Sequence, residues 1–170
     1  MQEMDGWLLS DKRAFKCGVD KNETRNGTES VFLKSVVPRP RDFGSMNKII
    51  DAALLVGKTL RMSAWLKTDL PEGASAQLWL RVDGDWKQRP AECFDNMFKR
   101  RVKGRNDWHH YEVSVEVPTP SQKIAYGVLL NGTGQLWLND IMLEQLDPSA
   151  SAWSMVPIGS AEKECRKSLK

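Results

Sequence analysis

Six short segments limit how this chain can fold, because apolar residues in each either alternate with polar ones or run together. They are residues 29–37, 58–69, 76–84, 110–118, 123–130 and 134–146. Turn-forming sequences such as PRPRDFG, DLPEG and NGTG lie between them. Alternation with period two is typical of a strand that buries one face, and many such strands joined by turns indicate packed antiparallel sheets. We therefore predict an all-β, two-sheet antiparallel β-sandwich.

Residues 45–57 are the segment that the pattern leaves open between a helix and a strand. The sequence SMNKIIDAALLVG has apolar residues at helical spacing and ends in a glycine, but it fits a strand with an irregular entry equally well. The strand pattern stops after Leu146. We expect residues 1–146 to form the domain and residues 147–170, rich in Ser, Ala and charge, to form a partly disordered C-terminal extension.

The bulk composition argues against two classes of partner. A net charge of +3 is too small to indicate nucleic acid, and no apolar run approaches the roughly 18 residues that span a membrane. Five basic residues in segment 98–105 indicate a solvated hairpin, with phosphate contact as the alternative.

Cys17, Cys93 and Cys165 are odd in number and widely spaced, which predicts reduced thiols. With no signal-peptide pattern at the start, we expect a cytoplasmic protein.

Tryptophan is unusually frequent, with seven residues against two tyrosines. Alternation places Trp65 beside Lys67 on the polar side of one predicted strand, and Trp79 beside Arg81 and Asp83 on the polar side of another. A flat aromatic ring next to forked hydrogen-bonding groups is suited to binding a hydroxylated ligand. The pattern is equally consistent with these tryptophans being buried, because tryptophan is highly buried on average.

Four motifs between Gly57 and Leu146 carry a resemblance to a known family. They are GKTLRMSAWLKT, LWLRVDG, FDNMFKRRVKGRNDWHHYEVSVEVP and IAYGVLLNGTGQLWLNDIMLE. Together they resemble galactose-binding-like jelly rolls related to carbohydrate-binding modules of the family 4/9 type. FDNM with the later DW is similar to a bacterial subgroup that stands alone or is attached to transcriptional regulators. The resemblance implies a jelly-roll fold and a non-catalytic domain that binds a small polar ligand, such as a carbohydrate. We expect the ligand to bind on one aromatic-lined sheet face that bears both Trp65 and Trp79. The expected ligand-binding residues are Trp65, Trp79, Arg81, Asp83, Asp95 and Asn96.

The resemblance also implies a structural calcium ion near the junction of the first and last strands. Its candidate ligands are Asp20 and Asp140, because calcium prefers carboxylate and carbonyl oxygens. Asn139 stands where the family pattern has a further aspartate, and this removes one negative charge from the expected site.

Two other functions remain open. One is a small cyclase-like enzyme, in which Asp95 or Asp83 would be the acid in an aromatic pocket. The other is a sensory or protein-interaction module of a bacterial regulator. No catalytic residue is assigned, because His109 has no evident nucleophile beside it and the SxxK at Ser160 lacks its partner motifs.

Overall fold

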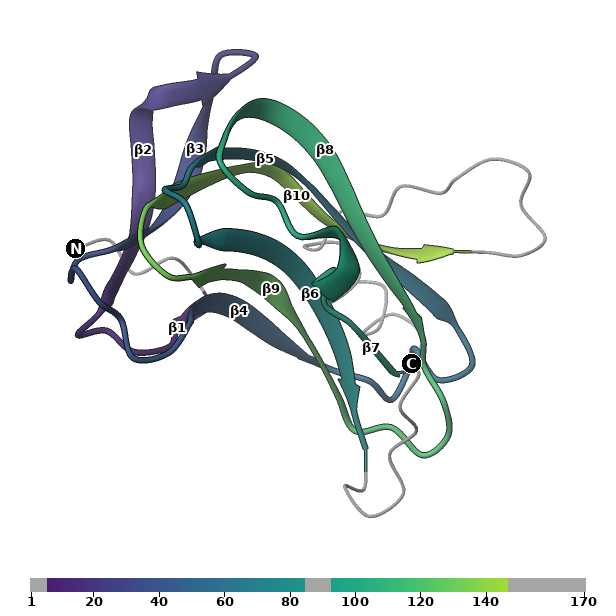
Figure 1. Ribbon diagram of the computed structural model, residues 1–170. Coiled ribbons are helices and arrows are strands. Elements are labelled where there is room, and N and C mark those ends of the chain that lie inside the picture. Colours follow the sequence, from purple (N-terminus) through teal and green to yellow (C-terminus); the bar gives the residue numbers. More distant parts are fainter. Residues whose placement is uncertain (1–5, 85–92, 147–170) are drawn as a thin grey trace.

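The computed structural model describes residues 6–84 and 93–146, which form two antiparallel sheets packed face to face (Figure 1). Sheet A has the strand order β1-β4-β9-β6-β7, and sheet B has the order β2-β3-β10-β5-β8. The strands of sheet A are β1 (Leu8–Leu9), β4 (Gly44–Asp51), β6 (Ser75–Asp83), β7 (Phe94–Asp95) and β9 (Lys123–Asn131). Those of sheet B are β2 (Phe15–Arg25), β3 (Thr28–Ser35), β5 (Thr59–Asp69), β8 (Arg105–Glu116) and β10 (Gln135–Leu146). The predicted all-β sandwich is confirmed.

The core lies between the sheets and follows the alternation of the sequence. Each strand turns every second side chain inward, and apolar residues occupy those positions. Leu80 and Tyr126, from β6 and β9, are fully buried. Alternation in the sequence predicts that six of these residues face the core, and all six are buried: Leu78, Leu80, Val82, Val113, Val115 and Leu138. Burying these apolar faces against each other is what holds the two sheets together.

The ambiguous segment 45–57 folds mainly as a strand. β4 pairs with β9 along its whole length, from Gly44 opposite Leu130 to Asp51 opposite Lys123. The two backbones approach so closely at Gly127 that an added Cβ atom would lie 2.1 Å from the carbonyl oxygen of Met46. Pairing with β9 satisfies the backbone groups of this segment, so tertiary contacts override its helical spacing.

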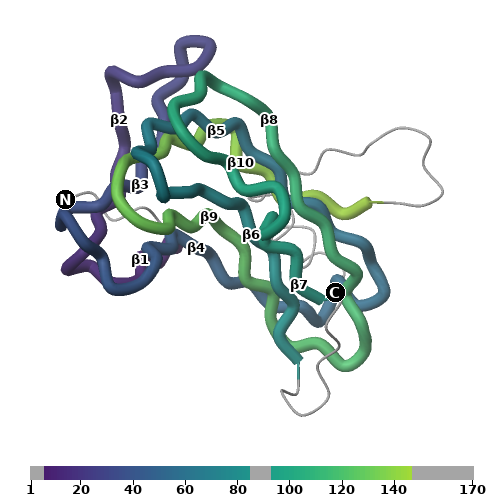
Figure 2. Tube along the Cα trace, in the orientation of Figure 1, coloured from purple at the N-terminus to yellow at the C-terminus, as the bar shows by residue number. Residues whose placement is uncertain are grey.

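The β2–β3 hairpin bends near its tip, which we define as residues 21–29 (Figures 1 and 2). The pairing register of β2 with β3 shifts between Asp20 and Thr24, and this shift bends the strand. Asn26 and Gly27 both have positive φ angles, which a tight two-residue turn requires. The tip is thereby turned relative to the rest of sheet B.

The basic segment 98–105 forms the 3₁₀ turn η2 (Phe98–Arg100) and the first residue of β8. Arg100 contacts Asp95 at 2.7 Å, and Arg105 contacts Asp69 at 3.1 Å. No helix among the described residues is long and apolar enough to cross a membrane. The predicted C-terminal extension, Ser160 and Cys165 lie outside the described residues.

Candidate ligand-binding surface

Trp65 and Trp79 lie on opposite sides of the molecule, so the predicted single face bearing both is wrong. Trp65 belongs to β5 in sheet B, and Trp79 belongs to β6 in sheet A. Alternation correctly predicts that each side chain points away from the core. The outward faces of two packed sheets point in opposite directions, and a local pattern does not show which sheet a strand joins.

Trp79 is buried on the outer side of sheet A, with 8% of its surface exposed. It lies opposite Gly127 of β9, which has no side chain, and its Nε1–H donates to Ser45 Oγ on β4 at 3.3 Å. The guanidinium of Arg81 lies 5.7 Å from the indole ring and pairs with Asp83 at 2.8 Å. Trp79 therefore packs the sheet together and offers almost no ring surface for stacking.

Asp95 and Asn96 fix the segment that follows β7 alongside β6. One Asp95 oxygen accepts the backbone N–H of Met97 at 3.0 Å, and the other accepts an Arg100 N–H at 2.7 Å. The backbone carbonyl oxygen of Asn96 accepts a hydrogen bond from Gln77 Nε2 at 2.7 Å. Arg81 and Asp83 thus lie near Trp79 on the outer side of sheet A, whereas Asp95 pairs opposite the inward-facing Leu80. None of these residues lies with Trp65, which belongs to sheet B.

The outer side of sheet B carries a second aromatic surface, which we call the tryptophan face: Phe32, Trp65, Lys67, Trp108 and Trp137. Pairing aligns Trp137 of β10 with Phe32 of β3 on one side and with Lys67 of β5 on the other. A register shift in β8 beside Lys67 brings Asp107 and Trp108 to the same level. All four aromatic side chains are partly exposed. Three neighbouring strands and β8 therefore present aromatic rings to solvent on one face.

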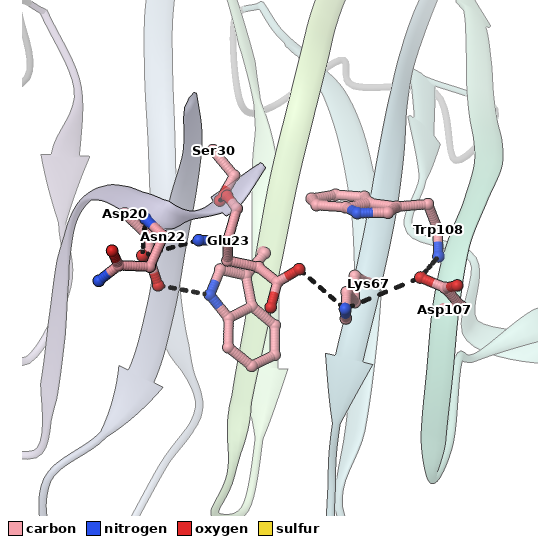
Figure 3. Close-up of polar contacts among 8 residues, drawn as sticks. Asp20, Asn22, Glu23, Ser30, Lys67, Asp107 and Trp108 are labelled. Atoms are coloured by element: carbon pink, nitrogen blue, oxygen red, sulfur yellow. Dashed lines mark hydrogen bonds and ion pairs between the residues drawn. The ribbon is translucent and has the colours of Figure 1, made fainter. Parts of the chain in front are cut away.

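Ion pairs join Lys67 of the tryptophan face to Glu23 and Asp107 (Figure 3). Lys67 Nζ lies 2.8 Å from Glu23 Oε1 and 3.8 Å from Asp107 Oδ1, and Trp108 lies above it in the view. The hydrogen bond from Lys67 to Glu23, with the charges of Glu23 and Asp107, raises the pKa of the lysine. Lys67 is thereby held in its charged form between two carboxylates.

Asp20 orients Trp137. The indole Nε1–H of Trp137 donates to Asp20 Oδ2 at 2.9 Å, and Asp20 Oδ1 accepts the backbone N–H groups of Asn22 and Glu23. The Trp137 hydrogen bond is the main cause that lowers the pKa of Asp20, and the Glu23 N–H adds to it. The ring of Trp137 is fixed in direction while remaining partly exposed.

The residues proposed for calcium do not fit a calcium ion. Asp20 is occupied as described, and Asp140 Oδ2 lies 2.6 Å from Arg25 Nη1. Asn139 directs its Nδ2–H group, a donor, to the carbonyl oxygens of Thr28 and Glu29 at 3.4 and 3.0 Å. Within the described ranges, no group of three or more His, Cys, Asp or Glu side chains could hold a metal ion. Asn139 thus presents a hydrogen-bond donor, not an oxygen ligand, to these two carbonyl oxygens.

Sequence reasoning missed Glu23, Lys67, Asp107, Trp108 and Trp137 as members of one surface. The signal for Trp137 was present, because Leu136 and Leu138 on either side of it point inward. No local feature of the sequence indicates that Glu23 belongs to this surface. Two strands, β3 and β10, lie between β2 and β5, and only the bend of the hairpin brings Glu23 to Lys67.

No family model matches the chain. It is 34% identical over 159 residues to an uncharacterized HTH-type transcriptional regulator, YbfP, of Bacillus subtilis strain 168. The match covers 91% of this chain and 52% of that protein. The chain therefore spans about half the length of this curated relative.

Solved structures share the fold at low sequence identity. The CBM22-1 xylan-binding domain of Paenibacillus barcinonensis Xyn10C matches with a TM-score of 0.58 and 12% identity, covering 85% of this chain and 88% of that one. A cyclase from Fischerella sp. matches with a TM-score of 0.60 and 12% identity, covering 86% and 85%. At such identity the likeness shows the fold alone. The chain is a jelly-roll β-sandwich of the architecture seen in carbohydrate-binding modules.

Proposed function

We propose that this domain is a non-catalytic carbohydrate-binding domain and that it binds its ligand on the tryptophan face of sheet B. The observation that carries the proposal is the set of partly exposed rings of Trp108 and Trp137 on either side of the Glu23–Lys67 ion pair. The fold shared with a xylan-binding domain supports the ligand class.

The arrangement suits a saccharide for two chemical reasons. Indole faces pack against the apolar C–H faces of sugar rings, while carboxylate and ammonium groups exchange hydrogen bonds with hydroxyls. Because Lys67 and Trp137 are already held by neighbours, binding orders few additional side chains. Adjacent strands are about 4.8 Å apart, so Phe32, Trp137 and Trp108 form a row that runs across the strands. We expect a short oligosaccharide to lie along this row.

Isothermal titration calorimetry with xylohexaose tests the proposal. We expect the wild type to bind, and Trp108→Ala and Trp137→Ala each to weaken binding at least about tenfold, because each variant removes a ring from the row. Phe94→Ala is the matched control, since Phe94 is an exposed aromatic residue of sheet A, 42% exposed. Equal affinity of the Trp108 variant and the wild type would contradict the assignment. Failure of xylohexaose, cellohexaose and β-1,4-galactotriose alike to bind would contradict the function.

The cyclase-like alternative receives less support from the geometry. Its candidate acids Asp83 and Asp95 contact Arg81 at 2.8 Å and Arg100 at 2.7 Å. Carboxylates paired with guanidinium groups are poorly arranged to give a proton to a substrate.

The name of the relative YbfP describes a transcriptional regulator, and this suggests a regulatory role for saccharide binding. We propose that the domain acts as the saccharide-sensing part of a longer regulator. The full-length protein should then change its affinity for operator DNA when the bound oligosaccharide is added, and the Trp108→Ala variant should not respond. A response in that variant equal to the wild type would contradict sensing through this face.

A further inference from the structure

We infer that Lys16 and Lys34 bind a carboxylate at one end of the tryptophan face, so that the domain prefers saccharides that carry a uronic acid. This inference deepens the proposed function and rests on it. Lys16 of β2 lies directly opposite Lys34 of β3. The next residue inward on β3, Leu33, faces the core, so both lysines lie on the outer side of sheet B. Two ammonium groups therefore share the side of the sheet that carries the aromatic rings.

The lysine pair adjoins the Phe32 end of the aromatic row. Lys34 follows Phe32 by two residues on β3, and Lys16 precedes Gly18, the residue opposite Phe32, by two residues on β2. Residues two apart on a strand share a face and lie about 7 Å apart. The Nζ atom of Lys34 lies 5.5 Å from the centroid of the Phe32 ring. A charged substituent on a sugar at this end of the row is thus within reach of both lysines.

Neither lysine has a carboxylate partner within residues 6–84 and 93–146, and both are at least partly exposed. Like charges directly opposite each other on neighbouring strands destabilise a sheet. An anion held between the two ammonium groups removes this repulsion. Four other cations of sheet B are already neutralised by a carboxylate: Lys67 by Glu23, Arg25 by Asp140, Arg61 by Glu144 and Arg105 by Asp69.

The two flanks of this end of the row carry opposite charges. Asp20 lies further along β2 on the side away from Lys16, and its oxygens accept hydrogen bonds from the Trp137 indole and from the backbone. The Trp137 hydrogen bond is the main cause that lowers the pKa of Asp20, and the charge of Lys34 contributes to a smaller extent. A carboxylate on the ligand is attracted to the lysine flank and repelled from the Asp20 flank. This difference sets the direction in which the substituent points.

A uronic acid is the saccharide group that matches both features of the site. Its ring has an apolar C–H face that packs on an aromatic side chain, and its carboxylate accepts charge-assisted hydrogen bonds from ammonium groups. Lys67 cannot replace the lysine pair in this role, because its ammonium group is already shared between Glu23 and Asp107. Lys16 and Lys34 are therefore the specificity-determining residues for acidic saccharides.

Calorimetric titration of xylotriose, with and without a glucuronic acid substituent, tests this inference. At low salt we expect the wild type to bind the acidic ligand about three- to tenfold more tightly than the neutral one. Sodium chloride should reduce this preference, because the lysines are accessible to solvent. The double variant Lys16→Gln, Lys34→Gln should bind both ligands equally and xylotriose within about twofold of the wild type. Lys34→Glu, which pairs with Lys16, should bind the acidic ligand less tightly than the neutral one.

Lys123→Gln is the matched control, because Lys123 is an exposed lysine of β9 on the other sheet. This variant should keep the full preference for the acidic ligand. Equal wild-type affinity for the two ligands, or a preference that survives in the double variant, overturns the inference and leaves the proposed function standing. Absence of binding of both ligands to the wild type overturns the inference together with the proposed function.

Discussion

Trp79→Ala distinguishes a packing tryptophan from a ligand-binding one. Burying a tryptophan side chain removes about 150–250 Å² from water, which at about 25 cal/mol/Å² corresponds to at most about 4–6 kcal/mol. Trp79 is 8% exposed, so nearly all of this burial free energy applies to it. Alanine keeps the Cβ atom, and Ser45 Oγ loses its indole donor at 3.3 Å. We expect the free energy of unfolding to fall by about 3–5 kcal/mol.

Urea denaturation followed by far-ultraviolet circular dichroism measures this loss without depending on tryptophan fluorescence. With a urea m-value of about 2 kcal/mol/M, the midpoint should fall by about 2 M. In the absence of urea, any folded Trp79→Ala protein should bind xylohexaose like the wild type, because Trp79 lies on the other sheet. A loss of stability below about 1 kcal/mol, or selective loss of binding in a folded variant, would refute the packing role.

Three further predictions concern the core, the metal and pH. Leu80→Ala should lower the free energy of unfolding by about 2–5 kcal/mol in the same assay, because it leaves a cavity between the sheets; a loss under 1 kcal/mol would contradict the assigned core. Calcium or EDTA should leave the melting temperature of the wild type unchanged in calorimetry, because Asn139 presents a donor to the Thr28 and Glu29 carbonyls; a calcium-dependent rise would contradict this. The pKa of Asp20 is lowered from 3.8 by the Trp137 indole, so its stabilising contribution is complete above that pH and is lost as the pH falls through the lower folded-state value. Asp20→Asn should therefore lose less stability than the wild type on acidification below about pH 4, and parallel acid-unfolding curves would argue against the Trp137 contact.

The inward and outward faces of single strands could be predicted because they depend only on neighbouring residues. Leu78 and Val82 of β6, and Val113 of β8, follow directly from alternation, and all three are buried. The helix-or-strand ambiguity at residues 45–57 could not be settled in the same way. Its outcome depends on pairing with β9, more than 70 residues further along the chain.

The candidate site was only partly predictable, because it depends on which strands pair. Trp65 was recognised as an outward aromatic residue, but its neighbours come from β10 and β8 rather than from β6. The contacts of Glu23 and Arg25 require the bend of β2 at its register shift. No local pattern in the sequence indicates that a hairpin tip folds back over its own sheet.

The indole Nε1–H signals of a ¹⁵N-labelled protein test the central claim most directly. Single Trp→Phe variants assign the signals, and xylohexaose is then titrated while two-dimensional ¹H–¹⁵N spectra are recorded. If sheet B carries the ligand, the Trp108 and Trp137 signals should shift and saturate together while the Trp79 signal stays in place. A saturating shift of Trp79 with Trp108 and Trp137 unmoved would contradict the account and return the binding site to sheet A.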